Sequence, residues 1–289
     1  MSARRLIVTS DDFGAALAVN EAVEQAHRNG ILTAASLMVS GDACADAIAR
    51  AKTMPKLGVG LHLVLVDGRP ILSPDEVPDL VGADGRFRDD MVAAAFNILR
   101  PRGRRQLARE IEAQFATFAA TGLPLDHVNA HKHFHLHPMI ADLILAAGRR
   151  HGLQGARAPI EPAALIAAID GRPQPLAARA TAQWARLIGA ELRNAGALVP
   201  DRVIGLAWSG AMTRERLAAI LERLPPGLSE VYLHPATDDT YPGHAPGYRY
   251  RDELAALIDP GMRTSIAERD IELGSFADFA KPVSRGVTA

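Results

Sequence analysis

The chain has 289 residues and a formal net charge of -1 at pH 7, which gives no electrostatic support for a nucleic-acid partner. Hydrophobic residues make up 48% and charged residues 22%, and this balance excludes a disordered chain. The single cysteine, Cys44, cannot form an internal disulfide, and no run approaches the roughly twenty apolar residues of a membrane-spanning helix. The N-terminus shows no signal-peptide core, so we expect a cytoplasmic protein, with peripheral membrane contact left open.

Strands and helices alternate through the first sixty residues. An apolar, β-branched run over 5–10 predicts a strand that ends at Asp11 and Asp12. Helical spacing of apolar residues predicts a helix over 15–29, and a strand over 34–39 and a helix over 42–52 follow. A third strand is expected over 57–63, with His62 near its carboxyl end. This alternation predicts a parallel sheet.

The middle of the chain holds an irregular segment and a histidine-rich stretch. Pro, Gly and Asp dominate 70–89, which predicts an irregular flap over the end of the sheet. The arginine run over 100–105 precedes an amphipathic helix over 106–120; we interpret it as solvated, with contact to anionic lipid headgroups as the alternative. A short strand over 125–130 and a helix over 138–151 flank the stretch that holds five of the ten histidines: His127, His131, His133, His135 and His137.

The remainder of the chain continues the same alternation. Strands or strand ends are expected over 155–159, 202–208, 229–234 and 271–273, and helices over 176–195, 213–224, 252–258 and 262–269. The strand over 229–234 finishes on His234. No change in composition divides the chain, so we predict a single domain over 1–289. An α/β barrel would gather all the strand-end residues at one face.

Side chains that bind metals recur at the predicted strand ends. Asp12, His62 and His131 follow three different strands, at the end where parallel α/β folds form their sites. One carboxylate and two imidazoles suit a divalent ion that keeps open positions for water and substrate. We therefore predict that these three residues bind one divalent metal ion, Zn²⁺ or Mg²⁺. A hydrogen-bonded core histidine and a solvated histidine-rich loop are the alternatives.

Other residues near this predicted metal site suggest hydrolysis. A metal-bound water loses its proton near neutral pH, and Asp11 is the predicted general base; helix capping is the alternative for one of the two acids. His234 is the predicted general acid for an amine leaving group. We expect His133 or His135 to lie behind the metal ligands or to face the substrate, and His137 to be structural.

Four motifs together resemble the YdjC-like carbohydrate deacetylases, over residues 6–279. They are Val8-Thr9-Ser10-Asp11-Asp12-Phe13-Gly14, Gly60-Leu61-His62-Leu63, the stretch from Asp126 to Pro138, and Leu233-His234-Pro235. The resemblance implies a divergent (β/α) barrel of the polysaccharide-deacetylase type and metal-dependent removal of an acetyl group from an N-acetylated amino sugar. It also implies the metal ligands Asp12, His62 and His131 and the base Asp11.

The chain departs from the common family pattern at two places. Thr9-Ser10 replaces Asn-Ala before the two acids, and Asn129-Ala130 replaces Asp-Ser before the leading histidine, so a carboxylate that would orient the site is missing. Further segments resemble the hopanoid-biosynthesis-associated (HpnK) branch: Arg157, Glu161, Trp208-Ser209-Gly210 and Arg251-Asp252-Glu253. This likeness implies roles at the substrate or behind the ligands for Arg157 and Trp208.

The branch resemblance implies an N-acetylglucosaminyl hopanoid lipid as substrate, at the inner membrane surface. The nearest alternative is a chitooligosaccharide, and the low aromatic content of 5% favours the lipid because sugar chains stack on aromatic rings. Apolar residues lining the flap would also favour the lipid. A metal-dependent phosphoesterase and a non-enzymatic metal-binding protein are more distant alternatives, and a homodimer is left open.

Overall fold

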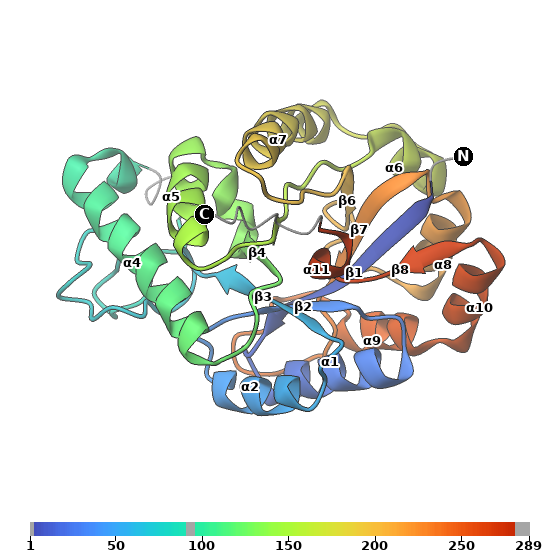
Figure 1. Ribbon diagram of the computed structural model, residues 1–289, viewed down its shortest axis with the longest axis horizontal. Helices are drawn as coiled ribbons and strands as arrows, with labels where there is room; N and C mark the ends of the chain where they lie inside the picture. The colour runs from blue at the N-terminus through green and yellow to red at the C-terminus, as the bar shows by residue number, and fades with distance from the viewer. Residues whose placement is uncertain (1–2, 91–95, 281–289) are drawn as a thin grey trace, which may run out of the picture.

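A single parallel sheet forms the centre of the molecule. The computed structural model describes residues 3–90 and 96–280 (Figure 1). The sheet has eight strands, in the order β5-β4-β3-β2-β1-β7-β6 with β8 beside β1. Every pairing is parallel, as the βα alternation predicts. The strands are β1 (Arg4–Phe13), β2 (Ala34–Leu37), β3 (Gly58–Leu63), β4 (His127–Ala130), β5 (Gly155–Ala156), β6 (Arg202–Ile204), β7 (Gly227–Leu233) and β8 (Ile271–Leu273).

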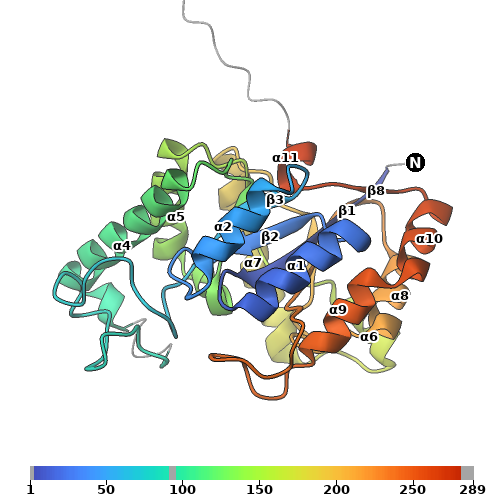
Figure 2. The same ribbon diagram turned by 90° about the horizontal axis from the view of Figure 1, so that it is seen from below.

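Helices surround the sheet (Figures 1 and 2). They are α1 (Leu17–Asn29), α2 (Cys44–Lys52), α4 (Pro101–Ala120), the 3₁₀ segment η1 (His131–Leu136), α5 (Pro138–Arg150), α6 (Ala163–Asp170), α7 (Leu176–Asn194), α8 (Arg214–Arg223), α9 (Tyr250–Ile258), α10 (Pro260–Glu268) and α11 (Phe276–Phe279). Because helices cover the sheet, β1 is buried continuously over residues 6–11. No helix within residues 3–90 and 96–280 is long and apolar enough to cross a membrane.

The two outer strands, β5 and β6, do not pair with each other, and each makes a backbone hydrogen bond to a segment just outside the other strand. Val203 N–H donates to the carbonyl of Ile160 at 3.1 Å, and Ala156 N–H donates to the carbonyl of Leu198 at 2.9 Å. The sheet therefore curves into a barrel that is incompletely closed between β5 and β6, and the predicted divergent (β/α) barrel is confirmed.

The end of the barrel where the strands begin is filled and covered. Ile7, Ala34, Leu228, Phe276 and Phe279 form a small hydrophobic cluster there, separate from the main core. Asp126, just before β4, accepts hydrogen bonds from the backbone N–H groups of Phe276 and Ala277 in α11. This end contributes stability, and the opposite end, where the strands finish, is left for a site.

The structure differs from the sequence prediction at several helix and strand boundaries. Helix α4 begins at Pro101 and not at residue 106, because proline suits the first helical position and the arginine run continues the helix. Strand β6 ends at Ile204, where Gly205 takes a φ of 147° and the Glu161 carboxylate accepts its N–H. The short helices α6 and α11 were not predicted. The segment over 70–89 is irregular, and Glu110 of α4 accepts the N–H groups of Ile71 and Leu72 from it.

Candidate active site

The carboxyl ends of the strands open into a cleft of about 560 Å³. Five predicted site residues from four strands line it, with His133 beside them: Asp11, Asp12, His62, His131 and His234. Charged residues also line it, with Asp67 and Arg69 just before the flap and Arg86 within it. The structure thus brings the predicted metal ligands, base and acid into one cavity, as the barrel topology requires.

Asp12, His62 and His131 form a compact set of ligand atoms. Asp12 Oδ1 lies 3.3 Å from His62 Nε2 and 3.4 Å from His131 Nδ1, and one ligand atom from each residue falls within 4.8 Å of the others. Asp12 Oδ1 is buried and has no hydrogen-bond partner among the described residues. An orphaned carboxylate oxygen facing two imidazole nitrogens fits a divalent cation.

The charges around these three residues also favour a cation. Burial would raise the pKa of Asp12, but the neighbouring His131 and His62 outweigh it and hold the pKa well below its usual range. Burial would lower the pKa of His62, but Asp11 and Asp12 outweigh it and raise that pKa. The carboxylates are thus ionised and the site draws positive charge.

A bulge at the end of β1 places both acids in the cleft. The pairing of β1 with β2 shifts register between Ser10 and Phe13, and Asp12 takes a left-handed φ of 62°. In a regular strand the two side chains would point to opposite faces. The bulge, a device common beside active sites, turns Asp12 toward the histidines while Asp11 stays in the sheet.

Asn129 orients both a predicted metal ligand, His62, and the predicted base, Asp11. Its Oδ1 accepts a hydrogen bond from His62 Nδ1 at 2.7 Å, which leaves His62 Nε2 free to bind an ion. Its Nδ2 donates to Asp11 Oδ1 and to Ser36 Oγ, both at 3.0 Å. Because the Asp11 carboxylate only accepts, the Asn129 amide has one orientation that satisfies every partner. The amide therefore takes the orienting role of the carboxylate that the family commonly has here.

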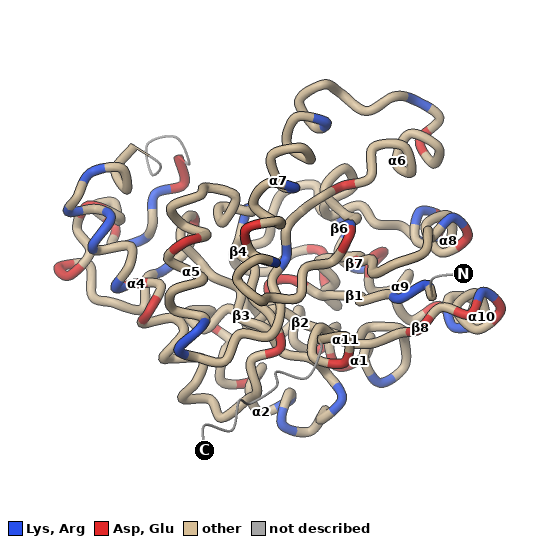
Figure 3. Tube along the Cα trace, turned by 45° about the horizontal axis from the view of Figure 1, so that its top comes forward, with Lys and Arg blue, Asp and Glu red and all other residues tan. Residues whose placement is uncertain are grey.

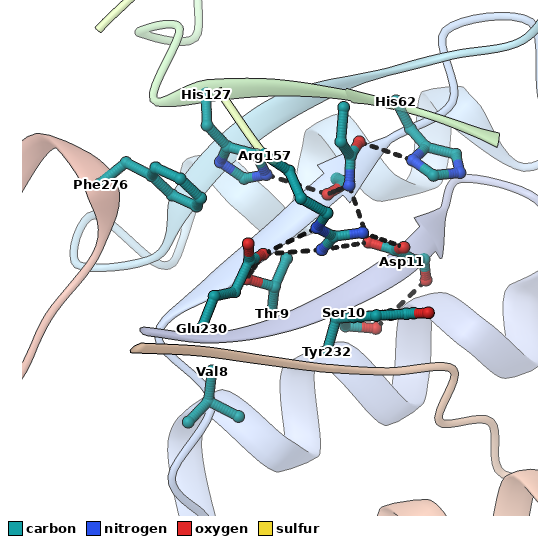
Figure 4. Close-up of polar contacts among 12 residues, drawn as sticks. Val8, Thr9, Ser10, Asp11, His62, His127, Arg157, Glu230, Tyr232 and Phe276 are labelled. Carbon is teal, nitrogen blue, oxygen red and sulfur yellow. Dashed lines mark hydrogen bonds and ion pairs between the residues drawn. The ribbon is translucent and has the colours of Figure 1, made fainter. Parts of the chain in front are cut away.

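Asp11 is held by a fully buried arginine. Arg157 donates to it twice, from Nη1 to Oδ2 at 2.5 Å and from Nη2 to Oδ1 at 2.9 Å (Figure 4). Burial would raise the pKa of Asp11, but the Arg157 guanidinium outweighs it and pushes the pKa far below its usual range. Asp11 is therefore ionised at any ordinary pH, with its orientation fixed by a bidentate pair.

Glu230 of β7 holds Arg157 from the other side. Glu230 Oε1 accepts from Arg157 Nε at 3.0 Å and Nη2 at 2.7 Å, and from Thr9 Oγ1 at 2.8 Å (Figure 4). The guanidinium carbon also lies 4.4 Å from the ring centre of Tyr232. One buried cation thus lies between two buried carboxylates and an aromatic face.

A column of buried polar side chains connects the site to the other end of the barrel. Ser36 Oγ, which accepts from Asn129, lies 2.9 Å from His127 Nε2, and His127 Nδ1 lies 2.9 Å from Asp126 Oδ2. The His127 ring stacks on Phe276 of α11 at 4.4 Å (Figure 4). The column ends at the backbone of α11, so the orientation of His62 depends on contacts across the whole barrel.

The other histidines of the 127–137 stretch separate because η1 is not extended. Lys132 and His133 both take left-handed φ values, 52° and 54°. His133 faces the cleft with Nε2 3.0 Å from Tyr232 Oη, whereas His135 lies beneath Arg157 and Asn129, away from the cleft. Burial lowers the pKa of His135 to about 3, so its ring is neutral. His137 is the residue before α5.

His234 lies across the cleft and is positioned by a buried glutamate. Its backbone N–H donates to Glu253 Oε2 at 2.5 Å, and the N–H of Met212 donates to Glu253 Oε1 at 2.8 Å. Burial lowers the pKa of His234, so the imidazole is neutral near pH 7. His234 Nδ1 is buried without a partner among the described residues, which leaves it available to a substrate.

All four tyrosines of the chain line the cleft, on or near the loop between β7 and α9. Tyr248 packs directly on the backbone of Gly210, where a Cβ would lie 2.1 Å from the ring, and its hydroxyl lies 2.8 Å from Ser209 Oγ. Trp208 does not line the cleft; its indole donates to Asp170. Sequence reasoning missed this cluster, although three of the tyrosines fall within ten residues: Tyr241, Tyr248 and Tyr250.

Comparison with known proteins agrees with this geometry. A carbohydrate deacetylase of Geobacillus stearothermophilus is 30% identical over 283 residues, which is 96% of this chain and 99% of that protein. A chitooligosaccharide deacetylase of Yersinia pestis is 28% identical over 94% of this chain and 98% of its own. A solved Enterococcus faecalis V583 structure, named a cellobiose-phosphate cleavage protein, has a TM-score of 0.78 at 23% identity, and covers 97% of this chain and 100% of that one.

The structural similarity shows the fold, and the sequence similarity shows the family. The model of the family described as YdjC-like protein matches residues 5–268, which includes every strand end that contributes to the cleft. The chain therefore belongs to the YdjC-like protein family.

Proposed function

We propose that this protein is a metal-dependent hydrolase that removes the acetyl group from an N-acetylated amino sugar. The observation that carries the proposal is the pair of adjacent acids in one cleft. Asp12 offers an unpartnered oxygen beside two imidazoles, and Asp11 is ionised and fixed beside it. The deacetylase names of the Geobacillus and Yersinia relatives support the same reaction.

Asp12, His62 and His131 would hold the ion, Zn²⁺ or Mg²⁺. A bound divalent ion polarises the amide carbonyl and lowers the pKa of water, which are the two requirements of amide hydrolysis at neutral pH. Asn129 keeps the Nδ1–H of His62 turned away, so that Nε2 presents its lone pair.

Asp11 would act as general base. Its carboxylate accepts a proton as the attacking water adds to the acetyl carbon, and Arg157 keeps the accepting oxygen in place. His234, neutral at rest, would take up a proton, equivalent to the one that Asp11 removed from the water, as negative charge develops on the tetrahedral intermediate. It would then pass that proton to the amine nitrogen as the C–N bond breaks, so that the products are acetate and the free amino sugar. His133 and Tyr232, hydrogen-bonded to each other in the cleft, would contact the substrate.

We infer that the amino sugar is carried by a hopanoid lipid, as N-acetylglucosaminyl hopanoid, at the inner surface of the membrane. Arg157 and Glu161, which the HpnK-like pattern includes, both act inside the fold: Arg157 holds Asp11, and Glu161 accepts the N–H groups of Gly205 and Ala207. Two residues of the HpnK-like pattern thus have definite roles inside the fold, and this supports the assignment to that branch.

A second candidate substrate, a chitooligosaccharide, is favoured by the composition of the cleft. Its four tyrosines offer faces on which sugar rings stack, and the one lining residue from the 70–89 flap is the charged Arg86. The overall aromatic content of 5% says nothing about location, so it does not weigh against this candidate.

Acetate release tests the proposal. The metal-loaded protein should release acetate from N-acetylglucosaminyl hopanoid or from chitooligosaccharides, and a chelator should stop it. Asp11→Asn should lower turnover by about 10²–10⁴-fold while metal binding persists. No acetate from either substrate would refute the reaction, and the preferred substrate would decide between the two candidates. Two tightly bound ions per chain would instead favour a phosphoesterase.

A further inference from the structure

Helix α7 exposes an apolar line along its outer face. Leu176, Ala180, Trp184 and Leu187 recur at intervals of four, four and three residues, which places them along one side of a helix. Leu176 is 79% exposed, Trp184 44% and Leu187 60%. The opposite side, with Ala182, Ala185, Ile188 and Leu192, packs against the fold. The helix therefore satisfies its inner face and leaves large apolar side chains in water.

Arginines outnumber acids around this outer face, where the exposed Glu191, four residues after Leu187, is the one acid of α7. Arg172, Arg179 and Arg186 are all exposed, and none of them pairs with a carboxylate in the described part of the chain. No acidic residue occurs between Asp170 and Glu191. Figure 3 shows Lys and Arg positions along this helix and the segment before it. Exposed leucines and a tryptophan flanked by unpaired arginines are typical of helices that lie on membrane surfaces.

A second exposed apolar site, at the start of α4, differs in its charges. Phe96 is 66% exposed and Leu99 59%, and several arginines follow them. Acids of the flap neutralise part of that charge, since Asp79 pairs with Arg102 and Glu76 pairs with Arg109. Within residues 3–90 and 96–280, α7 therefore offers the cleaner combination of apolar and cationic groups.

The outer face of α7 is coupled to the segment that carries a metal ligand. Trp184 Nε1 donates to the carbonyl of Leu136 at 2.8 Å, and Leu136 is the last residue of η1, which begins with His131. A surface that docks on α7 would therefore lie beside the cleft wall.

We propose that α7 docks the protein on an anionic phospholipid bilayer. Leu176 and Leu187 enter the interfacial region, the Trp184 ring lies at headgroup depth, and the three arginines contact lipid phosphates. Membrane docking itself does not depend on the proposed function. The inference rests on that function only for what docking would achieve, which is to bring the cleft to a sugar carried by a lipid. Charge complementarity selects the bilayer over a second copy of this chain, whose α7 would present the same arginines.

Vesicle flotation with the full chain tests the docking surface. We expect binding to phosphatidylcholine vesicles that contain about 30% phosphatidylglycerol, weaker binding to pure phosphatidylcholine, and weakening by added salt. Leu176→Ser with Leu187→Ser should weaken binding by at least about tenfold. Arg179→Gln with Arg186→Gln should weaken it further than about tenfold, because each cation contributes about fivefold. The matched control, Phe96→Ser with Leu99→Ser, should bind as the unmodified protein does.

Three results would overturn the proposal. They are equal binding to neutral and anionic vesicles, loss of binding in the α4 control in place of the α7 variant, and a dimer in sedimentation that the α7 leucine substitutions dissociate. The assay is independent of catalysis, so it fails separately from the proposed function. Acetate release from a soluble chitooligosaccharide should be unchanged in the α7 variants, which also shows that they fold.

Discussion

Two buried carboxylates, Asp11 in the cleft and Glu253 behind His234, show how a neighbouring cation decides the sign of a pKa shift. Asp11 has the guanidinium of Arg157 against it, and its pKa lies far below the usual range despite burial. Glu253 has two backbone N–H donors and no cation, and burial raises its pKa to about 7. Hydrogen bonds from neutral donors do not replace a charge.

Asp12 shows a third arrangement. Its pKa is lowered as that of Asp11 is, but no arginine pairs with it. Its neighbours are imidazoles, which can give up their protons, and one of its oxygens has no partner in the described structure. Asp11 has a permanent cation built into the fold, whereas Asp12 has the place for one that can be exchanged. Asp11 and Asp12 are adjacent but differ in their surroundings, because the cation beside Asp11 is a side chain of the protein, Arg157.

Removing the permanent cation should have the largest effect. Arg157→Met leaves Asp11 and Glu230 buried without their shared partner, and we expect a loss of about 3–5 kcal/mol in the free energy of unfolding. Urea denaturation measures it, with the exposed Arg223→Met as control, which should stay within about 0.5 kcal/mol. A loss below about 1 kcal/mol would mean that the two acids do not depend on Arg157.

Because no cation lies beside Glu253, the free energy of unfolding should change with pH by about 3 kcal/mol through this residue. The folded chain keeps the Glu253 proton up to about pH 7, whereas the unfolded chain releases it near 4.5, so stability from this group is present below about pH 4.5 and lost as pH rises through 7. Glu253→Gln does not titrate, and the stability of the unmodified protein should therefore fall relative to it over this window. Parallel pH profiles would contradict the shift; exposed Glu222→Gln is the control.

The smallest effect is expected at Asn129, which bonds to both His62 and Asp11. Asn129→Leu removes the acceptor for His62 Nδ1–H, and we expect metal affinity to fall by about 10–100-fold in competition with a chelator. Asn129→Asp keeps an acceptor for His62 Nδ1–H and introduces the residue that the family commonly has here, so it should retain most of the metal affinity. Equal metal affinity in the leucine variant would remove Asn129 from the positioning of His62.

The clustering of the predicted metal ligands could be predicted from sequence because parallel strands finish at one edge. Asp12, His62 and His131 each follow an apolar run, and the barrel topology brings their ligand atoms within 4.8 Å. The expected base and acid line the same cleft for the same reason. The roles of all five residues remain predictions until activity is measured.

The surroundings of the ligands could not be predicted because they depend on contacts between distant strands. Glu230 looks like an ordinary strand residue, and only the fold shows that it meets Arg157, 73 positions away. The left-handed turn at Lys132 and His133 has only a weak local signal, since histidine is enriched in that conformation but lysine is not. Asn129 was interpreted as a missing carboxylate, whereas its amide satisfies an acceptor and a donor at once.

The pairing of β1 with β7 and β8 has a consequence for synthesis. Thr9 meets Glu230 across 221 positions, and the first residues of β1 pair with β8 still later in the chain. At roughly 5–20 residues per second, a ribosome needs about 10–45 s to make the partner of a strand it has already released. Until Arg157 and then β7 are made, Asp11 lacks its guanidinium partner and β1 can pair only with β2. The surroundings of the predicted metal site are thus completed late, when the two ends of the chain join.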